Sequence, residues 1–132
     1  MPRWWRRSTL EARAVKCLGD VLFKGAYDII VRPGYVGAIG YLNGRPVALI
    51  VRTRGVLESI REFKRVYGLR SGSIVIIRAR SVKAALFIRR LIEHGYRVHS
   101  IITTDSEVRR MARCSGRIVE RIASSIVKAL GA

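Results

Sequence analysis

The residues of this sequence best suited to chemistry are aromatic and basic side chains that occur close together. Arg3-Trp4-Trp5-Arg6-Arg7 stands at the start of the chain, and a second group combines Arg32, Tyr35, Tyr41 and Arg52. Aromatic rings stack on unpaired bases with little regard to base identity, and guanidinium groups bind phosphates through paired hydrogen bonds. Side chains of these types, grouped in this way, are typical of a surface that binds single-stranded nucleic acid.

The charge balance of the whole chain indicates the same class of partner. Among 132 residues, 26 are Lys or Arg and 9 are Asp or Glu, which leaves a formal net charge of +17. The chain is 49% hydrophobic and is expected to fold, so this excess favours a polyanionic partner, nucleic acid before an anionic membrane. A thermophilic source would explain Arg in place of Lys, but thermophile ion-pair networks need acids as well.

Further basic residues stand next to the ends of predicted elements, where they are available to phosphates. These candidates are Arg54, Lys64, Arg65, Arg78, Arg80 and Lys83. The last three surround the predicted start of a helix, and we expect Ser81 to cap it. Free N–H groups and the helix dipole favour an anion at such a position.

Residue patterns of common catalytic and metal sites are missing from the sequence. It contains no P-loop, no G-x-S-x-G and no G-x-G-x-x-G after a predicted strand. Cys17 and Cys114 are far apart, each inside a predicted helix and without a CxxC partner, so no zinc module is indicated. We therefore expect no enzyme activity, no cofactor and no metal.

The sequence also bears on location. No stretch of about 18 uncharged apolar residues occurs, so no membrane-spanning helix is predicted. The basic start leads into an amphipathic segment, where a signal peptide would need an apolar one. We expect a cytoplasmic protein without a membrane partner.

The first half of the chain predicts a helix followed by a three-strand meander. Ser8-x-x-Glu11 has the form of a capping box, and the apolar residues after it predict a helix from about 9 to 24. Strands are predicted over 27–32, 35–42 and 45–53. Pro33-Gly34 and Asn43-Gly44 are the turns between them, and Asn-Gly is the strongest short hairpin signal.

The second half alternates helices and strands. A helix marked by Val56, Ile60, Phe63 and Tyr67 is followed by a strand over 73–78, a helix after Ser81 and a strand over 96–102. The two strands joined by a helix should be parallel. Thr104-x-x-Glu107 opens a long last helix to about Leu130.

The resulting order, α-β-β-β-α-β-α-β-α, predicts an α/β fold: a mixed sheet with an antiparallel meander, flanked by helices. We expect one domain over residues 1–132. Within it, residues 1–7 would form a basic-aromatic arm, 8–103 the α/β core and 104–132 the long C-terminal helix.

The hairpin register can be derived from the two-residue turn at Asn43-Gly44. It pairs Leu42 with Arg45 and places two sets of residues on opposite faces of the sheet. One face is apolar. The other carries Arg32, Tyr35, Gly37, Ile39, Tyr41, Ile50 and Arg52, with Ile30 beside them. This second face is either an open platform for bases or a face covered by further helices.

Two other segments also allow two interpretations. The last helix has an apolar pattern in 4-3 spacing, formed by Val108, Ala112, Ser115, Val119, Ile122, Ile126 and Ala129. This pattern packs either on the chain's own sheet or on a second copy, which would give a homodimer. Trp4 and Trp5 either stack on bases as a lid or fill a dimer contact.

The predicted order of elements resembles the core of PD-(D/E)xK nucleases, including archaeal Holliday-junction resolvases. That family places one acid on the second strand of the meander and Glu-x-Lys on the third. Here Ile50 would stand at the acid and Arg52 at the lysine, and no acid lies between Asp28 and Glu58. Without carboxylates to hold Mg²⁺, such a site cannot cut a phosphodiester.

The chain also resembles the ThermoDBP family, which are single-stranded DNA-binding proteins of certain thermophilic archaea. The resemblance rests on the stretch 35–41 (Tyr-Val-Gly-Ala-Ile-Gly-Tyr), on Arg52 and Arg54, and on the terminal helix from Ser106 to Leu130. The family implies a cleft lined by apolar and basic groups, and self-association through the last helix.

Taken together, these patterns predict a non-enzymatic protein that binds single-stranded DNA or RNA by aromatic stacking and Arg–phosphate contacts. The alternative is a catalytically dead, nuclease-like structural subunit of a nucleic-acid-processing or RNA–protein complex. The choice between DNA and RNA depends on contacts to the 2′-OH, which leave no mark on composition.

Overall fold

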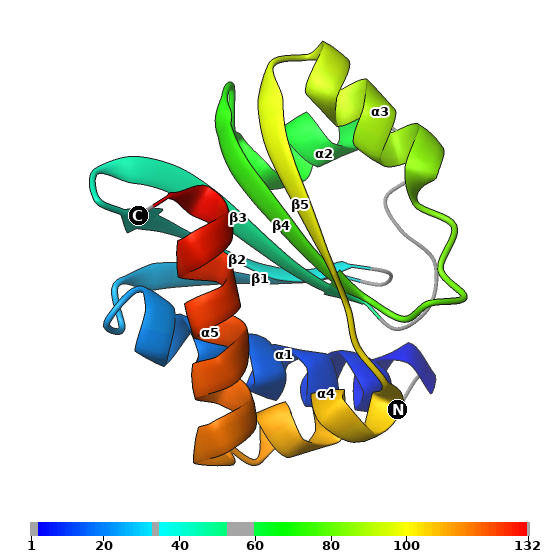
Figure 1. Ribbon diagram of the computed structural model, residues 1–132. Coiled ribbons are helices and arrows are strands. Elements are labelled where there is room, and N and C mark those ends of the chain that lie inside the picture. The colour runs from blue at the N-terminus through cyan, green and yellow to red at the C-terminus, as the bar shows by residue number, and fades with distance from the viewer. Residues whose placement is uncertain (1–2, 33–34, 53–59, 132) are drawn as a thin grey trace.

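The computed structural model of the chain describes residues 3–32, 35–52 and 60–131. For residues 3–8, Arg32, Tyr35 and Arg52 the description covers the backbone alone. A five-stranded mixed sheet lies between two layers of helices (Figure 1), which confirms the predicted α/β class. In chain order the elements are α1 (Arg3–Leu22), β1 (Tyr27–Arg32), β2 (Tyr35–Leu42), β3 (Arg45–Arg52), α2 (Ile60–Tyr67), β4 (Gly72–Arg78), α3 (Ala85–Glu93), β5 (Tyr96–Ile102), α4 (Asp105–Ala112) and α5 (Gly116–Leu130).

The sheet follows chain order, β1-β2-β3-β4-β5, and contains both kinds of pairing. β1, β2 and β3 form the predicted antiparallel meander, whereas β3, β4 and β5 are parallel and joined through α2 and α3. The derived register is confirmed, because Leu42 pairs with Arg45 and Gly37 with Ile50. Asn43 and Gly44 both have positive φ, as the twist-compatible two-residue hairpin turn requires.

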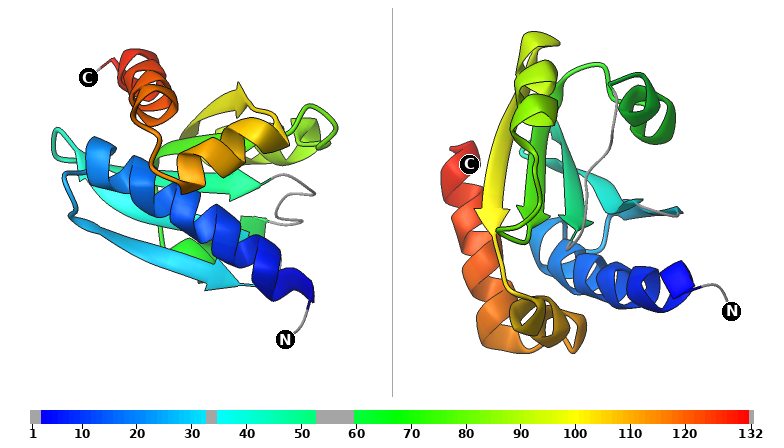
Figure 2. Two further views of the ribbon diagram at one scale, coloured as in Figure 1. Left: turned by 90° about the horizontal axis from the view of Figure 1, so that it is seen from below. Right: turned by 90° about the vertical axis from the view of Figure 1, so that its right-hand side faces the viewer.

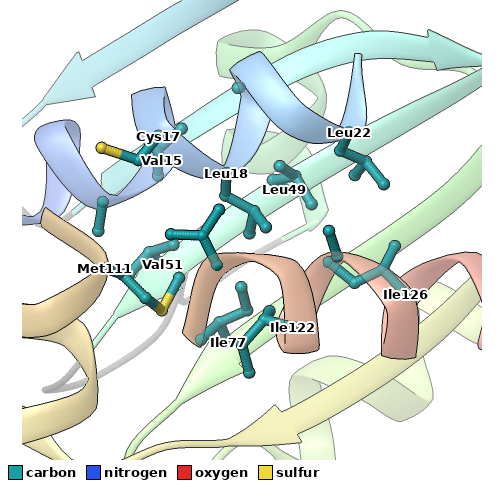
Figure 3. Packing of buried hydrophobic residues seen from close by; sticks show 14 of the residues in the cluster. Val15, Cys17, Leu18, Leu22, Leu49, Val51, Ile77, Met111, Ile122 and Ile126 are labelled. Atoms are coloured by element: carbon teal, nitrogen blue, oxygen red, sulfur yellow. The ribbon is translucent and has the colours of Figure 1, made fainter. Parts of the chain in front are cut away.

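The larger core lies between the sheet and the layer formed by α1, α4 and α5 (Figure 2). Apolar residues recur along α1 at helical spacing, so this helix buries one stripe against the sheet. Figure 3 shows Val15, Leu18 and Leu22 of α1 pointing toward Leu49 and Val51 of β3. Met111 of α4 and Ile122 and Ile126 of α5 close the same cluster.

A second core fills the space between the other sheet face and the layer of α2 and α3. The Phe63 ring stacks on Tyr67 and meets Phe87 and Tyr96 edge-on, with ring centroids 4.8, 6.2 and 5.5 Å away respectively. These aromatic contacts hold α2 and α3 against Ile74 and Ile76 of β4, which are fully buried.

The start of α1 differs from the prediction. The helix begins at Arg3 instead of near residue 9, so Ser8 and Glu11 lie inside it and do not form its capping box. Residues 3–7 are therefore part of a 20-residue helix and not a separate arm. The buried apolar stripe later in α1 stabilises the helix, and Arg and Trp at its start extend the helix by further residues at little cost in free energy.

The predicted long C-terminal helix is wrong, because the chain breaks it into α4 and α5. Cys114 stands at the break with φ of +53°, a left-handed conformation that a continuous helix does not contain. The capping box of Thr104 and Glu107 at the start of α4 is present as predicted. Of the 4-3 pattern, Val108, Val119, Ile122 and Ile126 are buried in the chain's own core, which settles that contact in favour of the sheet.

Cys17 and Cys114 form a disulfide, with their Cα atoms 5.2 Å apart. The sequence analysis did not predict this bridge, and its placement of Cys114 inside a helix is wrong. Cys17 is buried on α1, and Cys114 lies in the turn that joins α4 to α5. The bridge therefore ties the first helix to the last two across 97 residues of sequence.

Within residues 3–32, 35–52 and 60–131, no helix has both the length and the hydropathy that a membrane crossing needs.

We predict that loss of the disulfide destabilises the fold. Closing a loop of this length restricts the unfolded chain by about 4.7 kcal/mol in the chain-entropy model, and the loss should approach that value. Urea unfolding of the oxidised protein, the reduced protein and the Cys17→Ser/Cys114→Ser variant measures it. The reduced protein and the double variant should match each other. Two free thiols per chain in the protein purified without reductant would contradict the bridge.

A second prediction concerns the join between α4 and α5. Glu107 accepts a hydrogen bond from the Thr104 backbone N–H (3.0 Å) and one from Arg121 of α5 (2.5 Å). The hydrogen bond from the Thr104 backbone holds the pKa of Glu107 below its usual 4.5. Burial of the carboxylate opposes this shift, and the hydrogen bonds with the Thr104 and Arg121 side chains add to it. A carboxylate with a lowered folded pKa stabilises the fold above its unfolded pKa, and that stability is lost as pH falls through the folded value.

The test compares the wild type with Glu107→Gln by urea unfolding between pH 7 and pH 3. The variant should be about 1 kcal/mol less stable at pH 7, the typical value of a helix cap. The difference should shrink below about pH 4.5. A difference that stays constant over this range would show that the Glu107 carboxylate is not the stabilising form.

Candidate nucleic-acid interface

The ends of the parallel strands gather many of the predicted site residues at one edge of the sheet. β3, β4 and β5 end side by side, with Arg52 paired with Arg78 and Arg78 with Ile102. The meander turns at the same edge, where Arg32 pairs with Tyr35. We call this end the carboxyl edge and the opposite end, where the β2–β3 hairpin turns, the amino edge.

The first turns of α1 lie on the carboxyl-edge side as well. α1 leads directly into β1, which starts at the amino edge opposite Gly40, so the helix itself must start at the other end (Figure 1). The backbone of Arg3, Trp4, Trp5, Arg6 and Arg7 is thus placed beside the ends of the strands. Four parts of the chain that are far apart in sequence converge there: residues 3–7, residues 32 and 35 on either side of the β1–β2 turn, residue 52, and residues 78–83. Arg54 lies outside the described residues.

Arg78 is a structural residue of this edge. Its Nε donates to Ser100 Oγ on β5 at 2.8 Å, and its Nη1 donates to the Val82 carbonyl at 3.1 Å and to that of Ala79 at 3.5 Å. The guanidinium thus fastens the β4–α3 loop to the sheet. Its Nε and Nη1 are engaged within the chain, so this residue has a structural role, and its predicted phosphate contact stays a prediction.

Arg80 and Lys83 are exposed on the loop that Arg78 holds. The N-cap of α3 is Ala84, and no side chain caps the helix, so the expected Ser81 cap is wrong. The physical reason is that residues 81–84 remain outside the helix, which begins at Ala85. Two cations are therefore presented ahead of an uncapped helix start at the carboxyl edge.

The second face of the meander is not an open platform at its centre. Ala48 and Ile50 of β3 are 0% and 2% exposed beneath α2. A Cβ on Gly37 would meet the Leu49 carbonyl and lie 2.6 Å from the Tyr67 hydroxyl, so α2 sits directly on β2. The alternative of a helix-covered face is correct here, because α2 and α3 need an apolar surface to pack on.

Tyr41, Lys64 and Arg65 lie away from the carboxyl edge. Tyr41 is six residues beyond Tyr35 on β2, or about 20 Å at the rise of a strand, and its side chain is 66% exposed at the amino edge. Arg65 pairs with Glu62 at 3.3 Å. The predicted site residues therefore fall into two groups, one at each edge, separated by a covered core.

One feature of the amino edge was not predicted from sequence. A hollow of about 540 Å³ lies where α2 ends and is lined by Lys64, Gly68, Leu69 and Arg70. The available signal was Gly68, which takes a left-handed φ of +63° just after the helix and turns the chain there. Arg70 carries no motif of its own, so nothing in the sequence set it apart from the other 20 arginines.

The strands that would hold metal ligands in the nuclease family carry none here. β2 and β3 contain no Asp or Glu, and Ile50, where the resemblance would place an acid, is buried. In the part of the chain that the structure describes, no three His, Cys, Asp or Glu residues gather as a metal site.

Comparisons of the chain with protein-family models, with curated proteins and with solved structures gave no match.

The role given to Arg78 makes a prediction. Arg78→Ala should lower the free energy of unfolding by about 2 kcal/mol, because hydrogen bonds from a charged donor are lost. Arg80→Ala, two residues away and exposed, should change it by less than about 0.5 kcal/mol. Thermal unfolding of both variants beside the wild type measures the difference, and equal destabilisation by the two would contradict the fastening role.

Proposed function

We propose that the protein binds single-stranded nucleic acid without catalysing a reaction, with the carboxyl edge as its principal phosphate-binding surface. The charge balance is the observation that carries this proposal. Even if each of the 9 acids neutralised one basic residue, 17 basic residues would remain. A folded chain with this excess repels itself and attracts polyanions, which release counterions when they bind.

The convergence of chain segments supports the choice of the carboxyl edge. Exposed Arg80 and Lys83 follow the end of β4, which lies beside the end of β3 at Arg52. The end of β1 at Arg32 and the first turns of α1 lie on the same side of the sheet. Substrates of open α/β sheets commonly bind outside the carboxyl ends of the strands. Trp4, Trp5 and Tyr35, whose backbones lie at this edge, would supply rings for unpaired bases.

Single strands are favoured over duplex because of the aromatic residues. A ring can stack only on a base that is free of its neighbour, and such stacking is tolerant of sequence. Tyr41 exposes two thirds of its side chain to solvent instead of packing it, although it is large and apolar.

The nuclease-like structural subunit is the second candidate, and the strand register of the β1–β2–β3 meander favours it. Gly37 pairs with Ile50 where the family would hold its acids, and the face is sealed with apolar residues instead. Leu86 and Ile92 of α3 are 60% and 54% exposed and would offer contact to another polypeptide. Co-purification of a stoichiometric second protein would support this candidate.

The proposal also covers a homodimer through the C-terminal helix and a cytoplasmic location. The apolar stripe of α5 is used within the chain, so a homodimer through this helix would have to use its exposed side. A cytoplasmic protein with a disulfide would fit a hyperthermophile, in which intracellular disulfides are common.

The proposal predicts strongly salt-dependent binding. Fluorescence anisotropy with single-stranded DNA, single-stranded RNA and duplex should show the single strands bound more tightly. The logarithm of the affinity should fall with the logarithm of salt with a slope of about −0.7 for each phosphate contacted. Arg80→Ala/Lys83→Ala should reduce that slope by about 1 to 2. A flat salt dependence, or equal affinity for duplex, would overturn the proposal.

A further inference from the structure

The hollow at the amino edge has the chemistry of an anion site. Two of its lining residues, Lys64 and Arg70, are exposed cations, and in the described ranges neither takes part in an ion pair with an acid. Lys64 Nζ lies 3.4 Å from Nδ1 of His94, the residue that follows α3, which places the ammonium between α2 and α3. The hollow is thus lined by two positive charges and by the apolar side chain of Leu69.

The floor of the hollow is held in place by the sheet. The Tyr96 hydroxyl of β5 donates a hydrogen bond to the Leu69 carbonyl. Burial raises the pKa of Tyr96 above its usual 10.0, so this hydroxyl keeps its proton and remains a donor. Gly68 turns the chain out of α2, with its N–H bonded to the Lys64 carbonyl at 2.8 Å. Lys64 is therefore presented from the last turn of α2, and Arg70 from the fixed turn after it.

Tyr41 lies close to this hollow because of the strand register. Its side chain shares a face with Ile39, which packs against the α2/α3 core. Tyr41 pairs with Pro46 of β3. Pro46 in turn packs against Gly72 at the start of β4, because a Cβ on Gly72 would lie 2.7 Å from the Pro46 carbonyl oxygen and 3.0 Å from its Cγ. Two strand spacings, or about 10 Å, separate the β2 backbone at Tyr41 from the β4 backbone at Gly72, which follows Arg70 by two residues.

The electrostatics favour an anion despite the nearby end of α2. A helix carries about half a negative charge at its C-terminus, which disfavours a phosphate there. Two full positive charges line the same hollow, and one carbonyl of the last turn is already bonded to Gly68. The cations outweigh the dipole.

We infer that the amino edge is a second contact for the same single strand. Lys64 and Arg70 hold a backbone phosphate in the hollow, and Tyr41 stacks on a base beside it. This inference rests on the proposed function and extends the binding path from the carboxyl edge, around the covered core, to the opposite end of the sheet.

The test is anisotropy with a fluorescein-labelled oligothymidylate of about 16 nucleotides, the upper range for such sites, over a salt series. Lys64→Ala/Arg70→Ala should weaken binding about tenfold and make the salt slope shallower by about 1. Tyr41→Ala should weaken it about 5- to 150-fold, and Tyr41→Phe should bind like the wild type. The matched control is Arg117→Ala/Lys128→Ala, which removes the same charge from exposed positions on α5.

Photo-cross-linking gives an independent readout. A strand substituted with 5-iododeoxyuridine should cross-link to the peptide that contains Tyr41. Equal losses in the control variant, or unchanged binding by Lys64→Ala/Arg70→Ala with cross-links confined to the carboxyl edge, would overturn the inference and leave the proposed function standing. Wild-type protein that shows no salt-dependent binding would overturn both.

Discussion

The burial of β3 and β4 on both faces is the constraint from which the rest of the structure follows. Residues 47–51 are all buried, and so are residues 74–77. A central parallel pair of this kind must have helices on each side, because neither face can be left to water. α1, α4 and α5 cover one face, and α2 and α3 cover the other. Groups that meet a partner are consequently displaced to the two edges of the sheet and to the outer surfaces of the helices.

This constraint explains which sequence predictions succeeded. Local signals were sufficient for the hairpin at Asn43-Gly44 and for the capping box at Thr104, since each depends on a few neighbouring residues. The parallel pairing of β4 and β5 followed from the short helical crossover between them. The covered second face also had a signal. The run Val47-Ala48-Leu49-Ile50-Val51 is continuously apolar, which indicates a strand buried on both faces, whereas an open platform would alternate.

Other features depended on distances that the sequence does not contain. Cys17 and Cys114 are 97 residues apart, and only the packing of α1 against α4 brings them together. The break between α4 and α5 follows from that packing, because one straight helix could not serve both the Cys17 contact and the sheet. The division of the candidate site into two edges likewise required the fold. Tyr35 and Tyr41 share a strand face, but its centre lies under Tyr67.

The excess of positive charge links stability to binding. A chain with 17 uncompensated cations is destabilised by their mutual repulsion, and a bound polyanion relieves it. Any ligand that binds the folded form alone also stabilises it. The protein is therefore expected to be most resistant to unfolding when its surface is occupied.

All five strands lie between Cys17 and Cys114, so the bridge makes the sheet part of a covalent ring. A force applied to the two ends of the chain would load the sulfur–sulfur bond and the helical segments outside the ring, while the strands inside carried no tension. A cut in any single loop of the ring would leave both pieces joined, with every strand still tethered to its neighbours. The helices thus hold the sheet in two ways: they pack against it, and the disulfide between α1 and the α4–α5 turn closes the covalent ring that contains it.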